Sequence, residues 1–140
     1  MTAAAIKTGG GDPLSHAVAR AAADARGPVA IAVSGGSDSL ALLLLAAGAA
    51  RAQGKQIIAA TVDHGLRAEA AGEARWVAAQ CARLGVQHTV LRWDGEKPTS
   101  GIPAAARQAR YALLSAWARS LGADRILLGH TLDDQAETVA

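Results

Sequence analysis

Four short β-prone stretches recur along this chain at intervals of about thirty residues, and each is followed by a segment with helical periodicity. The β-prone stretches are residues 29–33, 56–62, 86–92 and 125–128. The helical segments after the first three are residues 37–53, 69–84 and 103–121, and a further helix is expected from Asp133. Strands that alternate with helices in this rhythm are typical of an open parallel sheet with helices on both faces. The expected fold class is therefore α/β.

Particular residues mark where the helices begin and end. Asp12 and Pro13 have the order of an N-cap and a first helical residue, so a helix should run from there to residue 25. Residues 1–12 show no apolar period, and we expect a loose tail there. The three later helices stop at glycines in the position of a C-terminal cap, namely Gly54, Gly85 and Gly122. One domain over residues 13–140 accounts for the whole pattern.

Composition excludes several classes of protein. With 51% hydrophobic and 19% charged residues, the chain is too apolar to be disordered. Its one cysteine, Cys81, forms no internal disulfide or cysteine metal site, which fits a reducing compartment, and we expect a cytoplasmic protein. The longest apolar run, residues 40–50, is much shorter than the roughly 20 residues of a membrane span. The net charge of +2 does not by itself indicate nucleic-acid binding.

The loop after the first β-prone stretch, residues 34–39, reads S-G-G-S-D-S and opens a helix. Glycines let the backbone approach an anion closely, and the N–H groups of a helix start attract negative oxygens. A bare tight turn capped by serine or aspartate is the alternative, but three serines and an aspartate in this place favour a phosphate cradle. The loop carries neither the G-K-S/T ending of a Walker motif nor G-x-G-x-x-G.

Acidic residues follow the fourth β-prone stretch, where the chain reads L-G-H-T-L-D-D-Q-A-E-T. On a helix from Asp133, Glu137 shares a face with Asp133 and with Asp134. Clustered carboxylates repel one another unless a cation lies between them. Acidic capping of a helix start is the alternative for this loop taken alone.

Two further segments carry polar side chains. Arg107, Arg110 and Tyr111 are three and four residues apart on the third helix, and paired guanidinium groups suit phosphate oxygens. A solvated helix face is the alternative for this spacing. The second β-prone stretch is followed by Asp63 and His64, which read equally well as an ordinary charged turn and would be a poor metal site without a third ligand.

The first loop resembles the pyrophosphatase loop of the PP-loop ATPases, which cleave ATP between its α and β phosphates and adenylate a substrate. Together with V-D-H-G-L-R, A-R-Q-A-R-Y and L-G-H-T-L-D-D-Q-A-E-T, it resembles the N-terminal catalytic domain of the tRNA(Ile)-lysidine synthetases. The resemblance implies an adenine nucleotide alpha hydrolase-like sheet in which the first and fourth strands are neighbours. Family members continue beyond the point where this chain stops, so we expect a domain incomplete at its C-terminus, with residues 125–128 at a sheet edge.

The resemblance also implies roles for individual residues. Asp38 would face Asp134 and Glu137 across the ligand crevice, where the three would hold Mg²⁺. The catalytic residues would be Asp38, Arg110, Asp134 and Glu137. The residues expected to bind ATP are Ser34, Gly35, Gly36, Ser37, Asp38, Ser39, Asp63, His64, Arg107 and His130.

The reaction that the family performs has two steps. The carbon-2 oxygen of the wobble cytidine of tRNA(Ile) with a CAU anticodon attacks the α-phosphorus of ATP, and pyrophosphate leaves. Free L-lysine then attacks carbon-2 through its ε-amine and releases AMP. A carboxylate, His64 or His130 would accept the amine proton, and the sequence does not choose among them. The resemblance also leaves the oligomeric state open, a homo-oligomer included.

Three other functions share parts of this pattern. A tRNA thiolase activates a base in the same way but uses paired cysteines, some near residues 104–111, where this chain has none. Amidotransferase-linked ligases differ in their later motifs. A non-catalytic nucleotide-binding module of the universal stress type shares the sheet order but has no need of Asp134 and Glu137 opposite Asp38.

Overall fold

The computed structural model describes residues 2–7, 11–34, 37–63, 69–93, 101–130 and 137–138. Its elements agree with the predicted alternation to within one or two residues at each end. The strands that match the four predicted stretches are β2 (Val29–Ala32), β3 (Ile57–Asp63), β4 (Gln87–Arg92) and β5 (Arg125–His130). The helices are α1 (Gly11–Asp24), α2 (Ser37–Ala52), α3 (Glu69–Leu84) and α4 (Ile102–Ser120).

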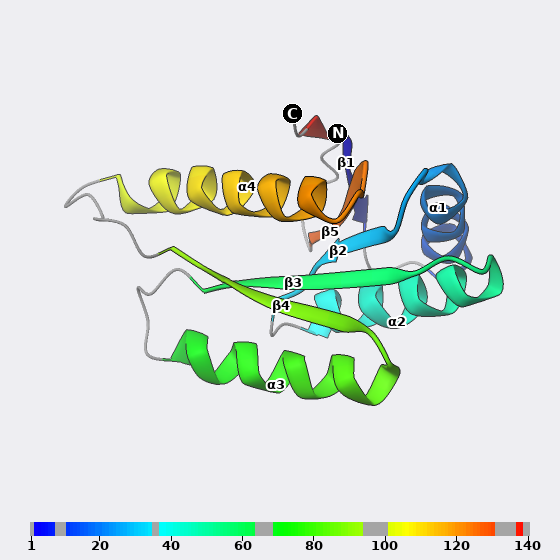
Figure 1. The fold of residues 1–140 in the computed structure, drawn as a ribbon, viewed down its shortest axis with the longest axis horizontal. Coiled ribbons are helices and arrows are strands. Elements are labelled where there is room, and N and C mark those ends of the chain that lie inside the picture. The colour runs from blue at the N-terminus through cyan, green and yellow to red at the C-terminus, as the bar shows by residue number, and fades with distance from the viewer. Residues whose placement is uncertain are drawn as a thin grey trace.

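The strands form one sheet with the order β4-β3-β2-β5-β1-β6, in which β1 to β5 are all parallel (Figure 1). Strand β2 lies between β3 and β5, and Ala30 pairs with Ile126 while Ala32 pairs with Leu128. The predicted adjacency of the first and fourth stretches is confirmed. An open α/β sheet with helices on both faces is confirmed as well.

The N-terminal segment differs from the expected loose tail. Residues Thr2–Lys7 form strand β1, which pairs in parallel with the whole of β5, from Thr2 beside Arg125 to Lys7 beside His130. Strand β5 is therefore not at a sheet edge, and that expectation is wrong. The physical reason is that β5 is apolar and would otherwise leave a row of backbone N–H and C=O groups unpaired.

The C-terminal segment differs too. Residues Glu137–Thr138 form β6, a two-residue strand antiparallel to β1, so the helix expected from Asp133 is wrong at these two positions. Residues 131–136 and 139–140 lie outside the described part of the chain. At residues 137–138, pairing with β1 satisfies the backbone groups that helical hydrogen bonds would otherwise satisfy.

The two faces of the sheet bury separate apolar clusters. Helices α1, α2 and α3 pack on one face, against Val29, Ile31, Ala59 and Leu127 among others. Among the described helices, α4 is the one that packs on the other face, through Leu114 and Trp117 (Figure 1). The strand residues on the α4 side are small or aliphatic, namely Ala30, Ala32, Ala60, Ile58, Ile126 and Leu128. A single helix can lie close to the sheet because three of them are alanines.

At the amino end of the sheet, the turn between α1 and β2 packs closely against the turn between α4 and β5. A Cβ atom on Gly27 would lie 2.1 Å from the carbonyl oxygen of Gly122, so only glycine fits this approach. Beside it, the backbone N–H of Arg26 donates to Asp124 Oδ1 at 3.2 Å. An ion pair of 3.7 Å joins Arg125 to Asp24. Gly122 has φ 82°, as the predicted helix cap requires.

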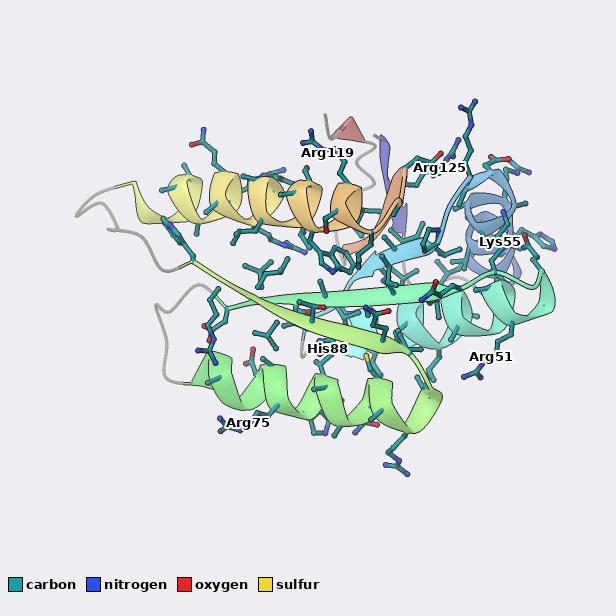
Figure 2. The ribbon with its side chains drawn as sticks, in the orientation of Figure 1. Arg51, Lys55, Arg75, His88, Arg119 and Arg125 are labelled. Carbon is teal, nitrogen blue, oxygen red and sulfur yellow. The ribbon has the colours of Figure 1, made fainter. Side chains whose placement is uncertain are left out.

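Two basic side chains near the end of α2 cap the C-terminal ends of helices α1 and α3. Lys55 Nζ donates to the carbonyls of Ala22, Ala23 and Ala25 at the end of α1. Arg51 donates to the carbonyl of Leu84, the last residue of α3. Both cations meet the negative end of a helix dipole and satisfy carbonyls that the helix leaves unpaired (Figure 2).

A buried polar pair lies under α3. Thr61 of β3 is buried, and its Oγ1 is 2.9 Å from Nε2 of His88 on the neighbouring strand β4. Figure 2 shows His88 on the side of β4 that faces α3. Burial lowers the pKa of His88, because the imidazolium form loses hydration there.

None of the helices in the described residues has the length and apolar character needed to cross a membrane.

We expect Gly27→Ala to lower the free energy of unfolding by about 1–3 kcal/mol, because the new methyl group would force the two turns apart. Gly48→Ala is the matched control: Gly48 lies within α2 and nothing would contact its Cβ within 4 Å. There the same change should raise stability by about 0.5–1 kcal/mol. Urea denaturation of both variants measures the two effects. Equal effects of the two substitutions would contradict the close approach at Gly27.

We expect His88→Gln to reduce the loss of stability on acidification. Folding favours neutral His88, whereas the unfolded chain takes up the proton near the ordinary pKa of about 6.5, so His88 makes stability fall as the pH drops below that value. Unfolding free energies at about pH 7.5 and pH 5 should therefore differ less in the variant. An unchanged pH dependence in His88→Gln would refute the assignment.

Candidate functional site

The sheet has one place where the connections leave in opposite directions. From β2, the chain adds β3 and β4 on one side, whereas β5 and β1 lie on the other. In open parallel sheets, ligands bind outside the carboxyl ends of the strands at this reversal. The loop that leaves β2 and the end of β5 therefore border the crevice that the fold offers to a ligand.

The loop after β2 runs from Ser34 into α2. Ser34 is exposed and Ser39 is buried in the first turns of the helix, and their hydroxyl oxygens are 2.9 Å apart. Ser37 and Asp38 begin α2, so its N–H groups and the positive end of its dipole face the crevice. Gly35 and Gly36 lie outside the described residues, as do the side chains of Ser37 and Asp38.

The three carboxylates expected around a metal are not brought together by the described structure. Glu137 lies in β6, where it pairs with Ala3, and Ala3 pairs with Ile126. Strands β5 and β1 therefore separate Glu137 from β2, about 14 Å at the usual strand spacing. Asp134 lies outside the described residues. Within the described residues, no three His, Cys, Asp or Glu side chains gather as metal ligands.

The ends of β3 and β5 hold two more predicted residues. Asp63 is the last residue of β3, beside Arg92 of β4, and its carbonyl accepts the N–H of Trp93 at 3.0 Å. Its partly buried side chain lies at the carboxyl end of the sheet, as expected. His130 ends β5 at the same edge, and only its backbone is described. His64 lies outside the described residues.

The predicted arginine face of α4 is present. The guanidinium carbon of Arg107 lies 5.8 Å from the ring centre of Tyr111, one turn further along the helix. Tyr111 packs against the apolar cluster under α4, so it anchors the exposed Arg107. Arg110 is partly buried. Helix α4 begins near the carboxyl ends of β3 and β4, which brings these cations toward the same edge of the sheet (Figure 1).

One feature of the loop was missed at the sequence level: Ser34 is exposed, whereas Ser39 is buried. Ser39 lies three and four residues before Leu42 and Leu43, and all three side chains are buried. This helical spacing marks Ser39 as part of the buried face of α2, and it could have been recognised.

An open groove of about 350 Å³ lies between α2 and α3. It is lined by Leu40, Leu44, Gln80, Arg83 and Leu84. With three leucines and a single charge, it lacks the array of donors that a polyphosphate requires, and we do not assign the nucleotide to it.

Comparison with known proteins agrees with this geometry. A family model described as a PP-loop domain matches residues 14–140. Among curated proteins, a tRNA(Ile)-lysidine synthase of Bradyrhizobium diazoefficiens is 58% identical over 111 residues, which cover 78% of this chain and 31% of that protein. The same-named protein of Rhizobium meliloti is 54% identical over 115 residues, covering 80% of this chain and 25% of that protein. The chain thus spans about a quarter to a third of the length of these relatives.

Among solved structures, a U34-tRNA thiolase of Methanococcus maripaludis, determined with its [4Fe-4S] cluster, superposes with a TM-score of 0.72. The match covers 86% of this chain and 45% of the thiolase at 19% sequence identity, so it supports the fold. Since the family model covers all but the first thirteen residues and the serine loop lies where a PP-loop fold places its ligand crevice, this chain belongs to the PP-loop domain family.

Proposed function

We propose that residues 13–140 form the ATP-binding catalytic domain of a tRNA(Ile)-lysidine synthase, which ligates lysine to carbon-2 of the wobble cytidine in a CAU anticodon. The observation that carries the proposal is the identity of 54–58% to proteins of that name, over 111–115 residues that make up 78–80% of this chain. The geometry supports the same assignment, because β2 and β5 pair side by side at the topological reversal.

The proposed nucleotide site is built around the start of α2. The pyrophosphate of ATP would lie over the loop of residues 34–39, where helix N–H groups and the Ser34 hydroxyl donate to its oxygens. Asp63 at the end of β3, His64 next to it in the sequence, and His130 at the end of β5 would line the remainder of the pocket. Arg107 and Arg110 would approach phosphate oxygens from α4, with Arg110 near the reacting centre.

The donor set suits Mg²⁺ in kind, because aspartate and serine oxygens are the hard ligands that this ion prefers. Asp38 at the start of α2 and Asp134, which follows β5 in the sequence, are the residues that would hold it. Glu137 would join them only if residues 137–138 left β6, so the proposal depends on the two aspartates. Mg²⁺ bound there would neutralise charge on the departing pyrophosphate.

The chemistry proceeds in two steps at this crevice. The cytidine carbon-2 oxygen forms a bond to the α-phosphorus of ATP while the bond to pyrophosphate breaks, and the N–H groups of α2 stabilise the charge that develops on the leaving group. The ε-amine of free L-lysine then attacks carbon-2, the bond to AMP breaks, and a proton leaves the amine. A crevice carboxylate, His64 or His130 accepts that proton.

A tRNA thiolase is the alternative within the same fold. Its support is the structural likeness at 19% identity, whereas the lysidine synthase of Bradyrhizobium diazoefficiens is 58% identical over 78% of this chain. Cys81 is the chain's one cysteine, and it is buried in the core under α3, where burial raises the pKa of its thiol. It is therefore not placed as a sulfur-transfer nucleophile.

Lysine incorporation tests the proposal directly. The gene product that carries these residues should join radiolabelled lysine to a tRNA bearing a CAU anticodon, with one AMP released per lysine. A tRNA with uridine in place of the wobble cytidine should accept none. Transfer of sulfur instead of lysine would identify a thiolase, and ATP binding without either transfer would identify a nucleotide-binding module.

We expect Asp38→Asn to lower the rate of Mg²⁺-dependent pyrophosphate release by about a hundredfold or more, because a neutral amide is a poor ligand for the ion. The melting temperature should change little, because asparagine is about as favourable as aspartate at the start of a helix. Asp24→Asn, at the amino end of the sheet, removes the same charge and should keep full activity. Wild-type pyrophosphate release by Asp38→Asn would remove Asp38 from the metal site.

A further inference from the structure

One side of α3 carries four side chains at the spacing of a coiled-coil seam. Glu73, Trp76, Gln80 and Arg83 follow one another at intervals of three, four and three residues, so they lie along the same side of the helix. Trp76 is 45% exposed, and Glu73 and Arg83 are exposed as well. We call these four residues the α3 seam. An indole that is half in water, between an acid and a base, is typical of an interaction surface.

The α3 seam borders the open groove of about 350 Å³ between α2 and α3. The groove is lined by three leucines and two polar side chains, namely Leu40, Leu44, Gln80, Arg83 and Leu84. Leu44 is 50% exposed, and Trp76 lies one helical turn before Gln80. Within the described part of the chain, two of the four exposed large apolar side chains therefore adjoin this groove. In Figure 1, α3 lies at the outer edge of the described structure.

The charges of the α3 seam are complementary to themselves. Glu73 is near the start of α3 and Arg83 near its end, about 15 Å apart along the helix axis. When two α3 helices pack antiparallel about a two-fold axis, Glu73 of each copy lies opposite Arg83 of the other. The same register places Trp76 of each copy opposite Gln80 of the other, beside the exposed Leu44 in the groove wall.

We propose that the α3 seam and the groove beside it form a dimer interface, at which two copies of this chain pack antiparallel through α3 and the Trp76 indole of each copy fills the groove of the other. A nucleic acid fits this surface poorly, because three leucines and the Glu73 carboxylate offer its phosphates little. A second copy matches both charges by symmetry. The two oxygens of Glu73 can accept from Arg83 of the other copy in addition to the contacts that Glu73 makes within its own chain.

This inference does not depend on the proposed function, because no residue of the α3 seam is placed in the nucleotide site. Its test is the oligomeric state of the protein that carries this chain, measured by sedimentation velocity at micromolar concentration, where we expect a dimer. Glu73→Arg and Arg83→Glu each place like charges opposite one another at two contacts of the dimer. Each should raise the dissociation constant of the dimer by about a hundredfold or more.

Mixing the two variants tests the pairing itself. In a mixed dimer, each introduced charge meets an introduced charge of opposite sign, so an equimolar mixture of Glu73→Arg and Arg83→Glu should dimerise although neither variant does so alone. Both reversals in one chain should restore the dimer as well. Arg75→Glu is the matched control, because it reverses an exposed charge of α3 that lies off the seam and should leave the dimer intact.

The proposal fails if the unaltered protein is a monomer, since another segment or another protein then covers the groove. It also fails if the two charge-reversal variants keep the wild-type melting temperature and their mixture stays monomeric. Trp76→Ala serves as a second test that needs no charge reversal: it should weaken the dimer about tenfold or more and leave the melting temperature of the monomer unchanged. A dimer as tight as that of the unaltered protein would overturn the placement of Trp76 in the interface.

Discussion

The pairing of β2 with β5 is the contact on which the other features of this molecule depend. It joins two segments far apart in the sequence and places the serine loop beside the end of β5. The pairing also brings Ala30 and Ala32 next to Ile126 and Leu128, which together form the surface under α4. Helix α4 in turn carries Arg107 and Arg110 toward the same edge. Without this strand pair, neither the crevice nor the apolar surface on which α4 packs would form.

Much of this arrangement could be predicted because its causes are local. Central strands such as 29–32 are short apolar runs, and each helix between them ends at a glycine that adopts positive φ, 67° at Gly54 and 70° at Gly85. Strand β1 has no such local cause. Its alanine-rich sequence favours a strand less than a helix, and it becomes a strand because β5 needs a partner on its second side.

The candidate site could be predicted in position but not in detail. Loop sequence at the end of a strand is enough to locate an anion cradle, since the helix start supplies the N–H groups. Which of the two described serine side chains is exposed depends on the packing of α2: Ser34 is exposed, whereas Ser39 lies on the same buried helical face as Leu42 and Leu43. The placement of Glu137 depends on β6, a pairing between the two ends of the chain that no local pattern indicates.

Two basic side chains cap the C-terminal ends of α1 and α3, and this affects how the net charge of the chain should be interpreted. Lys55 already donates to three carbonyls of α1, and Arg51 to the end of α3. Cations held in this way contribute to the net charge of +2 but are committed to the protein's own backbone. The salt dependence of RNA binding is governed by counterions released when cations meet phosphates, so it counts only the side chains that are still able to turn outward. Of the fourteen Lys and Arg side chains, at least these two would therefore contribute little to the salt dependence of binding to a polyanion.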